Sequence, residues 1–224
     1  MSTDFTAVWN QAYGKHQNAL FLPNEHLVRF VATRLRQRLT LDSFRDIAAL
    51  PSCPRVIDLG CGMGRHLAYL TEMQFSAYGI DLSDVAVAHA CDWLRRLGVD
   101  DSRVVTGSAV TLPWGDGMFD AAVSHAMLDS IPYDVAEAAV LELRRVVKPG
   151  GWVYIDLIAS PDGAAFEEIV TGPHETGTVQ SYFDVAKLRR LLSLFKIDEM
   201  YLASTNPVVG VRKSVRARWH VVCR

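Results

Sequence analysis

Short apolar runs alternate with longer amphipathic stretches through the middle of this chain. The apolar runs predict strands at Arg55–Leu59, Ala77–Asp81, Val104–Thr106, Phe119–Ser124 and Trp152–Ile158. The amphipathic stretches predict helices at Arg65–Met73, from Ser83 to about Leu97, and at Val135–Val147. Strands that alternate with helices indicate an α/β fold, in which helices cover both faces of a parallel sheet.

The two ends of the chain depart from this alternation. Near the start, apolar residues at helical spacing predict a helix over 24–39, with Asn24 as its N-cap. Near the end, a predicted helix that begins at Asp184 is followed by two apolar runs, Phe195–Leu202 and Val215–Val222, with no helix between them. Consecutive strands without a crossover helix pair most easily in antiparallel fashion. We therefore expect the sheet to finish in an antiparallel strand pair.

The length suits one domain, because 224 residues can bury a substantial core. We expect a single domain over 1–224 with four parts. These are an N-terminal helical cover over 1–50, a core over 55–158, a probable substrate loop over 159–183, and a terminal helix and strand pair over 184–224. The length and the Gly and Pro content of 159–183 predict a mobile loop over the site.

The first predicted strand runs into a turn rich in glycine. The turn contains Asp58, Gly60, Cys61, Gly62 and Gly64. Closely spaced glycines let the backbone bend sharply and approach a ligand, and the helix that follows offers free N–H groups at its start. The pattern predicts a seat for a nucleotide-like cofactor. The dinucleotide fingerprint would need a third glycine where this chain has Arg65, so the spacing disfavours a nicotinamide dinucleotide.

The D-x-G-x-G-x-G spacing resembles motif I of the class I S-adenosylmethionine-dependent methyltransferases. Three further segments follow in the order typical of that family: Asp81 at the end of the second strand, the Gly107–Ala109 loop, and the Lys148–Gly151 junction, which is similar to L-x-P-G-G. The resemblance implies S-adenosylmethionine as cofactor. It also implies a Rossmann-like, seven-stranded, mostly parallel sheet with a terminal antiparallel strand and helices on both faces.

The resemblance implies a set of cofactor-binding residues as well. Asp81 is expected to accept hydrogen bonds from both ribose hydroxyls; the alternative is a helix N-cap, a role that Ser83 can fill. Ser108 stands where the family often has an aspartate facing the adenine, and its hydroxyl or the N–H of Ala109 can bond the adenine edge. The full expected set is Asp58, Gly60, Cys61, Gly62, Gly64, Asp81, Leu82, Ser108, Ala109 and Ser124.

In the family, the end of the fourth strand lies beside the transferable methyl group. His125 directly follows Ser124 at that point, and histidine can act as a base near neutral pH, so His125 is the candidate catalytic residue. The alternative is a histidine that packs on the cofactor or bonds a loop. The cover segments contribute Tyr13, His16 and His174, which we expect to line the substrate site with His125. The N-terminal segment resembles the cover of tellurite- and thiopurine-type methyltransferases.

Composition narrows the choice of partner. A formal net charge of -2 and a pI near 6.4 argue against electrostatic binding of nucleic acid. No apolar run approaches the length that spans a membrane. Asp4 lies in a polar start that does not read as a secretory signal, and the four cysteines lack metal-ligand spacing. We therefore expect a small-molecule acceptor, a cytoplasmic monomer or homodimer, no bound metal, and no nucleic-acid or membrane partner.

Two other functions compete with a methyltransferase. A cofactor-binding module without catalysis, serving as a partner or sensor, would need the same glycines and the same Asp81. A nicotinamide-dependent oxidoreductase would use a similar sheet, but Arg65 and the terminal strand pair disfavour it.

Overall fold

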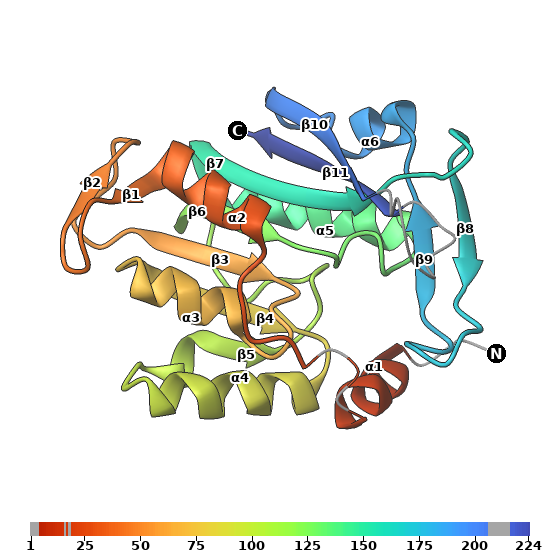
Figure 1. The fold of residues 1–224 in the computed structure, drawn as a ribbon, viewed down its shortest axis with the longest axis horizontal. Helices are drawn as coiled ribbons and strands as arrows, with labels where there is room; N and C mark the ends of the chain where they lie inside the picture. Colours follow the sequence, from red (N-terminus) through yellow and green to blue (C-terminus); the bar gives the residue numbers. More distant parts are fainter. Residues whose placement is uncertain (1–4, 16, 18, 206–215) are drawn as a thin grey trace.

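A seven-stranded sheet forms the centre of the computed structural model in Figure 1, which describes residues 5–15, 17, 19–205 and 216–224. The strand order is β10-β11-β7-β6-β3-β4-β5. Neighbouring strands pair in parallel except at β11, which is antiparallel to both β7 and β10. The predicted fold class is thus confirmed. The strands are β3 (Arg55–Leu59), β4 (Ser76–Asp81), β5 (Val104–Thr106), β6 (Phe119–Ser124), β7 (Val147–Ile158), β10 (Ile197–Thr205) and β11 (Arg216–Cys223).

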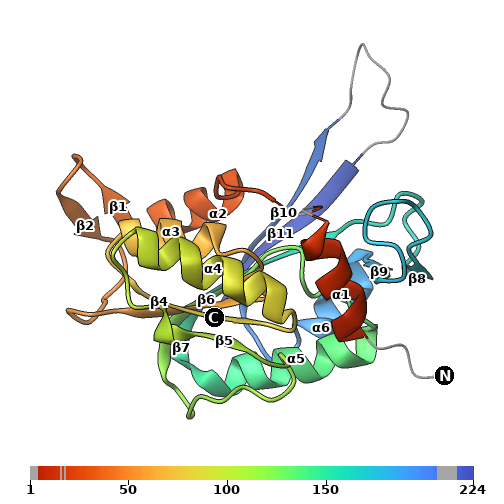
Figure 2. The same cartoon turned by 90° about the horizontal axis from the view of Figure 1, so that it is seen from below.

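Helices cover both faces of this sheet, as Figure 2 shows from the side. One face packs against α2, α3 and α4, and the other against α5 and α6. The helices are α1 (Phe5–Gly14), α2 (Glu25–Phe30), α3 (Arg65–Glu72), α4 (Asp84–Arg96), α5 (Tyr133–Val146) and α6 (Val185–Leu191). A π-helical turn (Val31–Leu35) extends α2, and a short 3-10 helix (Asp101–Arg103) precedes β5.

The alternation of strand side chains explains these two layers. In β3, Ile57 and Leu59 face the layer of α5, whereas Val56 faces the layer of α3; all three are fully buried. The central strands are therefore apolar at most positions, because both of their faces are buried. The hydroxyl of Ser83 accepts a hydrogen bond from the N–H of Ala86 at 3.1 Å and so caps α4, as the sequence predicts.

The helix predicted over 24–39 is too long. Helical structure stops at Leu35, and the chain continues as β1 (Arg36–Arg38), which pairs with β2 (Phe44–Asp46). The guanidinium of Arg36 lies 2.5 Å from the carboxylate of Asp46, and it also donates to two carbonyls at the end of α3. These contacts between distant parts of the chain outweigh the local helical spacing.

Residues 159–183, which the sequence predicts to be a loop, contain regular secondary structure. They contain a two-stranded hairpin, β8 (Phe166–Ile169) paired with β9 (Val179–Tyr182). The rings of Phe166 and Tyr182 stack across it with centroids 4.3 Å apart. Figure 1 shows this hairpin and α1 beside the edge of the sheet toward which the parallel strands point.

Candidate functional site

The glycine turn between β3 and α3 has the backbone geometry that its sequence requires. Gly60 and Gly62 both have positive φ, at +75° and +51°. The N–H groups of Gly60 and Cys61 donate to the carbonyl of Ile80 at 2.9 and 3.0 Å, which fastens the turn to β4. A Cβ at Gly62 would lie 2.8 Å from the hydroxyl of Tyr13. Glycine at this position therefore leaves room for α1 to approach the turn.

Asp81 lies at the end of β4 and holds the turn from the other side. Its Oδ2 accepts from the N–H of Gly62 at 2.8 Å, and its Oδ1 accepts from the N–H of Ser83 at 2.9 Å. Burial raises the pKa of Asp81 to about 6, although the N–H groups of Ser83 and Gly62 oppose that shift. Each oxygen keeps a lone pair for a further donor.

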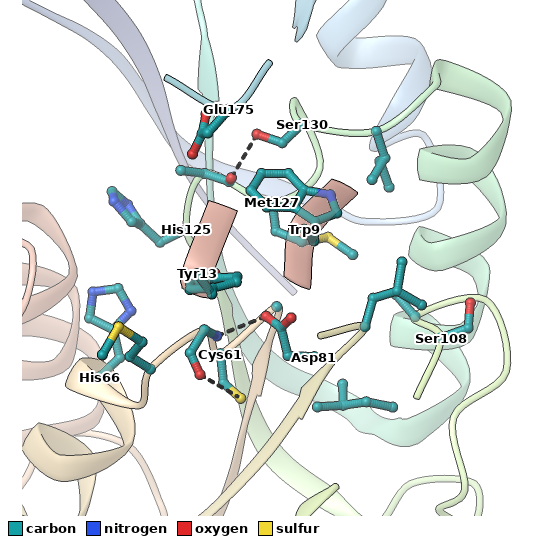
Figure 3. Close-up of a pocket in the computed structure, with 18 of the residues that line it drawn as sticks. Trp9, Tyr13, Cys61, His66, Asp81, Ser108, His125, Met127, Ser130 and Glu175 are labelled. Carbon is teal, nitrogen blue, oxygen red and sulfur yellow. Dashed lines mark hydrogen bonds between the residues drawn. The ribbon is translucent and has the colours of Figure 1, made fainter. Parts of the chain in front are cut away.

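A cavity of about 430 Å³ opens above the turn, at the carboxyl ends of the parallel strands. In the view of Figure 3, Asp81 and Cys61 lie in the lower centre, and Trp9 and Met127 lie above them. The structure brings ten of the expected site residues together around this cavity. They are Tyr13, Gly60, Cys61, Gly62, Asp81, Leu82, Ser108, Ala109, His125 and His174.

Three expected cofactor residues lie outside this lining. Asp58 is fully buried under the turn. Gly64 begins α3 and packs against Ala90 of α4. Ser124 is buried, and its hydroxyl donates to the carbonyl of Leu59 at 3.3 Å, which links β6 to β3. His16, expected to line the substrate site, lies outside the described residues.

The carboxylate of Asp58 has unused hydrogen-bonding capacity. Both of its oxygens are buried without a hydrogen-bond partner, and Nδ1 of His66 lies 3.7 Å from Oδ2. Burial lowers the pKa of His66, and Asp58 only partly offsets that shift, so His66 is neutral at pH 7. A buried carboxylate without a donor is costly, and such groups are typical of binding sites that a cationic ligand completes.

Two segments that are distant in the sequence cover the cavity together. The side-chain amide of Gln17, just after α1, donates to the carbonyl of Pro173 at 2.9 Å and accepts from the N–H of Glu175 at 2.9 Å. The hydroxyl of Ser83 donates to the side chain of Asn10 at 2.6 Å and ties α1 to the start of α4.

His125 follows the end of β6 and shares one wall of the cavity with His66. The two rings meet edge to face, with centroids 5.2 Å apart (Figure 3). Nδ1 of His125 is buried and lies 2.7 Å from Oδ2 of Asp156. The next residue, Ala126, has a positive φ of +53°, which is unusual for a residue with a Cβ.

Several lining residues were absent from the sequence-based set. The loop after His125 and the start of α5 contribute Ala126, Met127, Ser130, Ile131 and Val135. The glycine turn adds Met63, and the start of α3 adds Arg65 and His66. The other additions are Trp9, Leu20, Ile80, Gly107, Val110 and Glu175. The sequence does indicate the loop after His125, because a loop at the carboxyl end of a parallel strand faces the ligand site in open α/β sheets.

Residues 57–155 match the protein family described as a methyltransferase domain. Residues 57–155 of this chain therefore resemble that family, and the strand order and the glycine turn agree with the resemblance.

Individual relatives resemble different shares of the chain. A demethylmenaquinone methyltransferase from Beutenbergia cavernae is 34% identical over 137 residues, which cover 61% of this chain and 52% of the relative. The chain spans about half the length of the curated relatives it matches. A solved 1,6-didemethyltoxoflavin-N1-methyltransferase from Burkholderia thailandensis, with that compound and S-adenosylhomocysteine bound, has a TM-score of 0.71 at 17% identity. The match covers 100% of this chain and 91% of that one. The [4+2]-cyclase SpnF has a TM-score of 0.64 at 20% identity, covering 98% and 92%.

No helix among the described residues is long and apolar enough to cross a membrane. Within the same residues, no group of three or more His, Cys, Asp or Glu side chains could hold a metal ion.

Proposed function

We propose that this chain transfers the methyl group of S-adenosylmethionine to a small-molecule acceptor in the cavity above the glycine turn. The observation that carries the proposal is that one cavity joins the turn and Asp81 to His125. A pocket of this size, lined by aromatic and apolar side chains together with polar groups, suits a small molecule. The bound small-molecule substrate in the toxoflavin-type neighbour supports the same class of acceptor.

The residues present fit the cofactor at two charged or polar points. The carboxylate of Asp58, buried under the turn, would attract the ammonium of the methionine half by charge and without direct contact. The free lone pairs of Asp81 suit the ribose hydroxyls. Leu82, Ser108 and Ala109 would flank the adenine. Gly64 and Ser124 would act indirectly, by holding the elements around the turn.

S-adenosylmethionine supplies a methyl group on a positively charged sulfur, which is a good leaving group. For direct in-line transfer, the main tasks of the protein are to align the acceptor and to exclude water. Tyr13 and His174 on the cover, and His125 on the wall, are the side chains that we propose to contact the acceptor. His125 would accept a proton from the acceptor where methylation requires one to leave.

S-adenosylhomocysteine is expected to stabilise the protein against heat, and NAD is not. Ligand at 100 times its Kd adds about 2.7 kcal/mol to the stability, which corresponds to a rise in Tm of roughly 5–10 °C for a chain of this size. Differential scanning fluorimetry with each ligand measures this. Stabilisation by NAD alone would contradict the proposed cofactor. Transfer of a labelled methyl group to components of a metabolite extract then separates an enzyme from a silent binding module.

The affinity for S-adenosylhomocysteine is expected to fall as the pH falls through about 6. Asp81 must be ionised to accept both ribose hydroxyls, and burial raises its pKa to about 6. At lower pH a proton must leave before the ligand binds, which costs up to about tenfold in Kd per pH unit. Calorimetric titrations between pH 5 and 8 measure this. Asp81→Asn should bind more weakly and lose the pH dependence. An equal slope in both proteins would exclude Asp81 as its source.

A further inference from the structure

The pairing of β6 with β7 places a carboxylate behind the cavity-lining histidine. Ser124 pairs with Ile155 in parallel register, so the next residues along each strand, His125 and Asp156, lie side by side. Asp156 is only 1% exposed. Its Oδ2 lies 2.7 Å from Nδ1 of His125, which is within hydrogen-bond distance, although the N–H is not aligned with that oxygen and no hydrogen bond is formed. Such contacts in enzymes without substrate often tighten when the complex forms.

A second layer of charge keeps Asp156 ionised. Arg218 of β11 donates to Oδ2 of Asp156 from Nε at 3.1 Å and to Oδ1 from Nη2 at 3.2 Å. Burial raises the pKa of Asp156, but Arg218 and His125 outweigh it and hold that pKa well below its ordinary value. The same Nη2 donates to Asp129 at 2.7 Å. Arg218 thus bridges two buried carboxylates, of which only Asp156 contacts His125.

Asp156 also fixes the backbone next to the histidine. The N–H of Ala126 donates to Oδ1 of Asp156 at 2.7 Å, and Ala126 is the residue with φ of +53°. A residue with a Cβ is strained in this region of backbone conformation. Local strain that the surroundings maintain is common where a side chain must be held in one place. One carboxylate therefore bonds the peptide that follows His125 and also lies against its ring.

A second histidine, His220, lies near Asp156 but bonds a different group. Nδ1 of His220 is 4.0 Å from Oδ2 of Asp156 but only 2.8 Å from the hydroxyl of Tyr154. Burial lowers the pKa of His220 to about 4, so it is neutral at pH 7.

We propose that Asp156 is the positioning residue for His125 and that the methyl acceptor carries an O–H or N–H proton that is lost on transfer. This inference rests on the proposed methyltransferase function. With Nδ1–H directed at the carboxylate, Nε2 keeps the lone pair that faces away from Asp156. A fixed tautomer with a free nitrogen is what a general base requires.

The proposed methyl transfer conserves atoms and charge. The acceptor oxygen or nitrogen forms a bond to the methyl carbon, the carbon–sulfur bond breaks, and its electron pair stays on sulfur, which loses its positive charge. The O–H or N–H bond of the acceptor breaks, its electron pair stays on the acceptor, and its proton goes to Nε2 of His125. The resulting imidazolium is stabilised by the ionised Asp156 and later releases the proton to water.

The test is the tautomer of His125 in the free protein, read by NMR of ¹⁵N-histidine-labelled samples, with His125→Gln used to assign the resonances. The expected result for the wild-type protein is a single neutral tautomer with the proton on Nδ1. Asp156→Asn should lose that single-tautomer pattern. Asp129→Asn is the matched control, because it removes the other buried carboxylate bonded to Arg218 and should keep the pattern.

Two outcomes would overturn the proposal: a wild-type tautomer with the proton on Nε2, or equal loss of the pattern in both variants. If Asp156→Asn does not fold, the wild-type tautomer alone decides. Thermal stabilisation of the wild-type protein by S-adenosylhomocysteine, measured on the same samples, distinguishes failure of the role of Asp156 from failure of the proposed function. A wrong tautomer with that stabilisation intact refutes the role of Asp156 and leaves the proposed function standing.

Discussion

Replacing Asp58 by alanine is expected to weaken binding of S-adenosylhomocysteine by roughly 10- to 100-fold without lowering the stability of the free protein. Asp58 lies under the cavity lining, so it would act on the ammonium of the ligand by charge alone. Opposite charges about 6–10 Å apart attract by about 1.5–3 kcal/mol at an effective dielectric constant near 20, and each 1.4 kcal/mol corresponds to tenfold in Kd. In the free protein both oxygens of Asp58 are buried without a hydrogen-bond partner, so their removal relieves a desolvation cost. Calorimetric titration and thermal melts measure the two quantities.

Asp120 provides the control for Asp58, because it is a buried aspartate at the opposite end of the parallel strands. Its carboxylate accepts from the N–H of Arg55 at 2.8 Å and pairs with Lys148. Asp120→Ala should therefore lower the stability by roughly 1–3 kcal/mol and leave the affinity unchanged. A loss of stability without loss of affinity in Asp58→Ala would show that Asp58 serves the fold and not the ligand.

Gly64→Ala is expected to lower the stability of the fold by about 2–5 kcal/mol. Gly64 has φ of +89° at the start of α3, and a Cβ there would lie 2.9 Å from the Cβ of Ala90 and 3.1 Å from its Cα. The left-handed backbone costs about 1–2 kcal/mol for alanine, and overpacking adds typically 1–3 kcal/mol. Urea denaturation of the two proteins measures the difference.

A substitution at Gly98 measures the backbone cost without the overpacking cost. Gly98 also has a positive φ, at +72°, but a Cβ there would meet no atom within 4 Å. Gly98→Ala should thus cost only the backbone part, about 1–2 kcal/mol. Equal losses at both sites would mean that the approach of α3 to α4 is not what requires glycine at position 64.

The sequence was sufficient where a residue's role depends on its local pattern. The strands at Arg55–Leu59, Val104–Thr106 and Phe119–Ser124 have the predicted bounds, because each is a short and largely apolar run. The glycine turn and Asp81 lie at the cavity for a related reason: parallel strands end at the same edge of the sheet.

The sequence was insufficient where a role depends on pairing across the fold. The end of the first long helix depends on Arg36 meeting Asp46, and local spacing contains no information about that contact. Likewise, Asp156 lies in an apolar strand, and its relation to His125 follows only from the register of β6 with β7. Arg218 joins them from a strand whose place beside β7 is known only from the folded sheet.

The walls of the cavity come from two parts of the chain with different relationships to known proteins. The floor and one wall belong to residues 57–155, the region matched by the family. The cover, which includes Trp9, Tyr13 and His174, lies entirely outside that region. During evolution the cover can therefore change shape while the floor is preserved. Two proteins that share the floor can differ in what they enclose, and the substrate of a relative matched over the floor alone does not carry over to this chain.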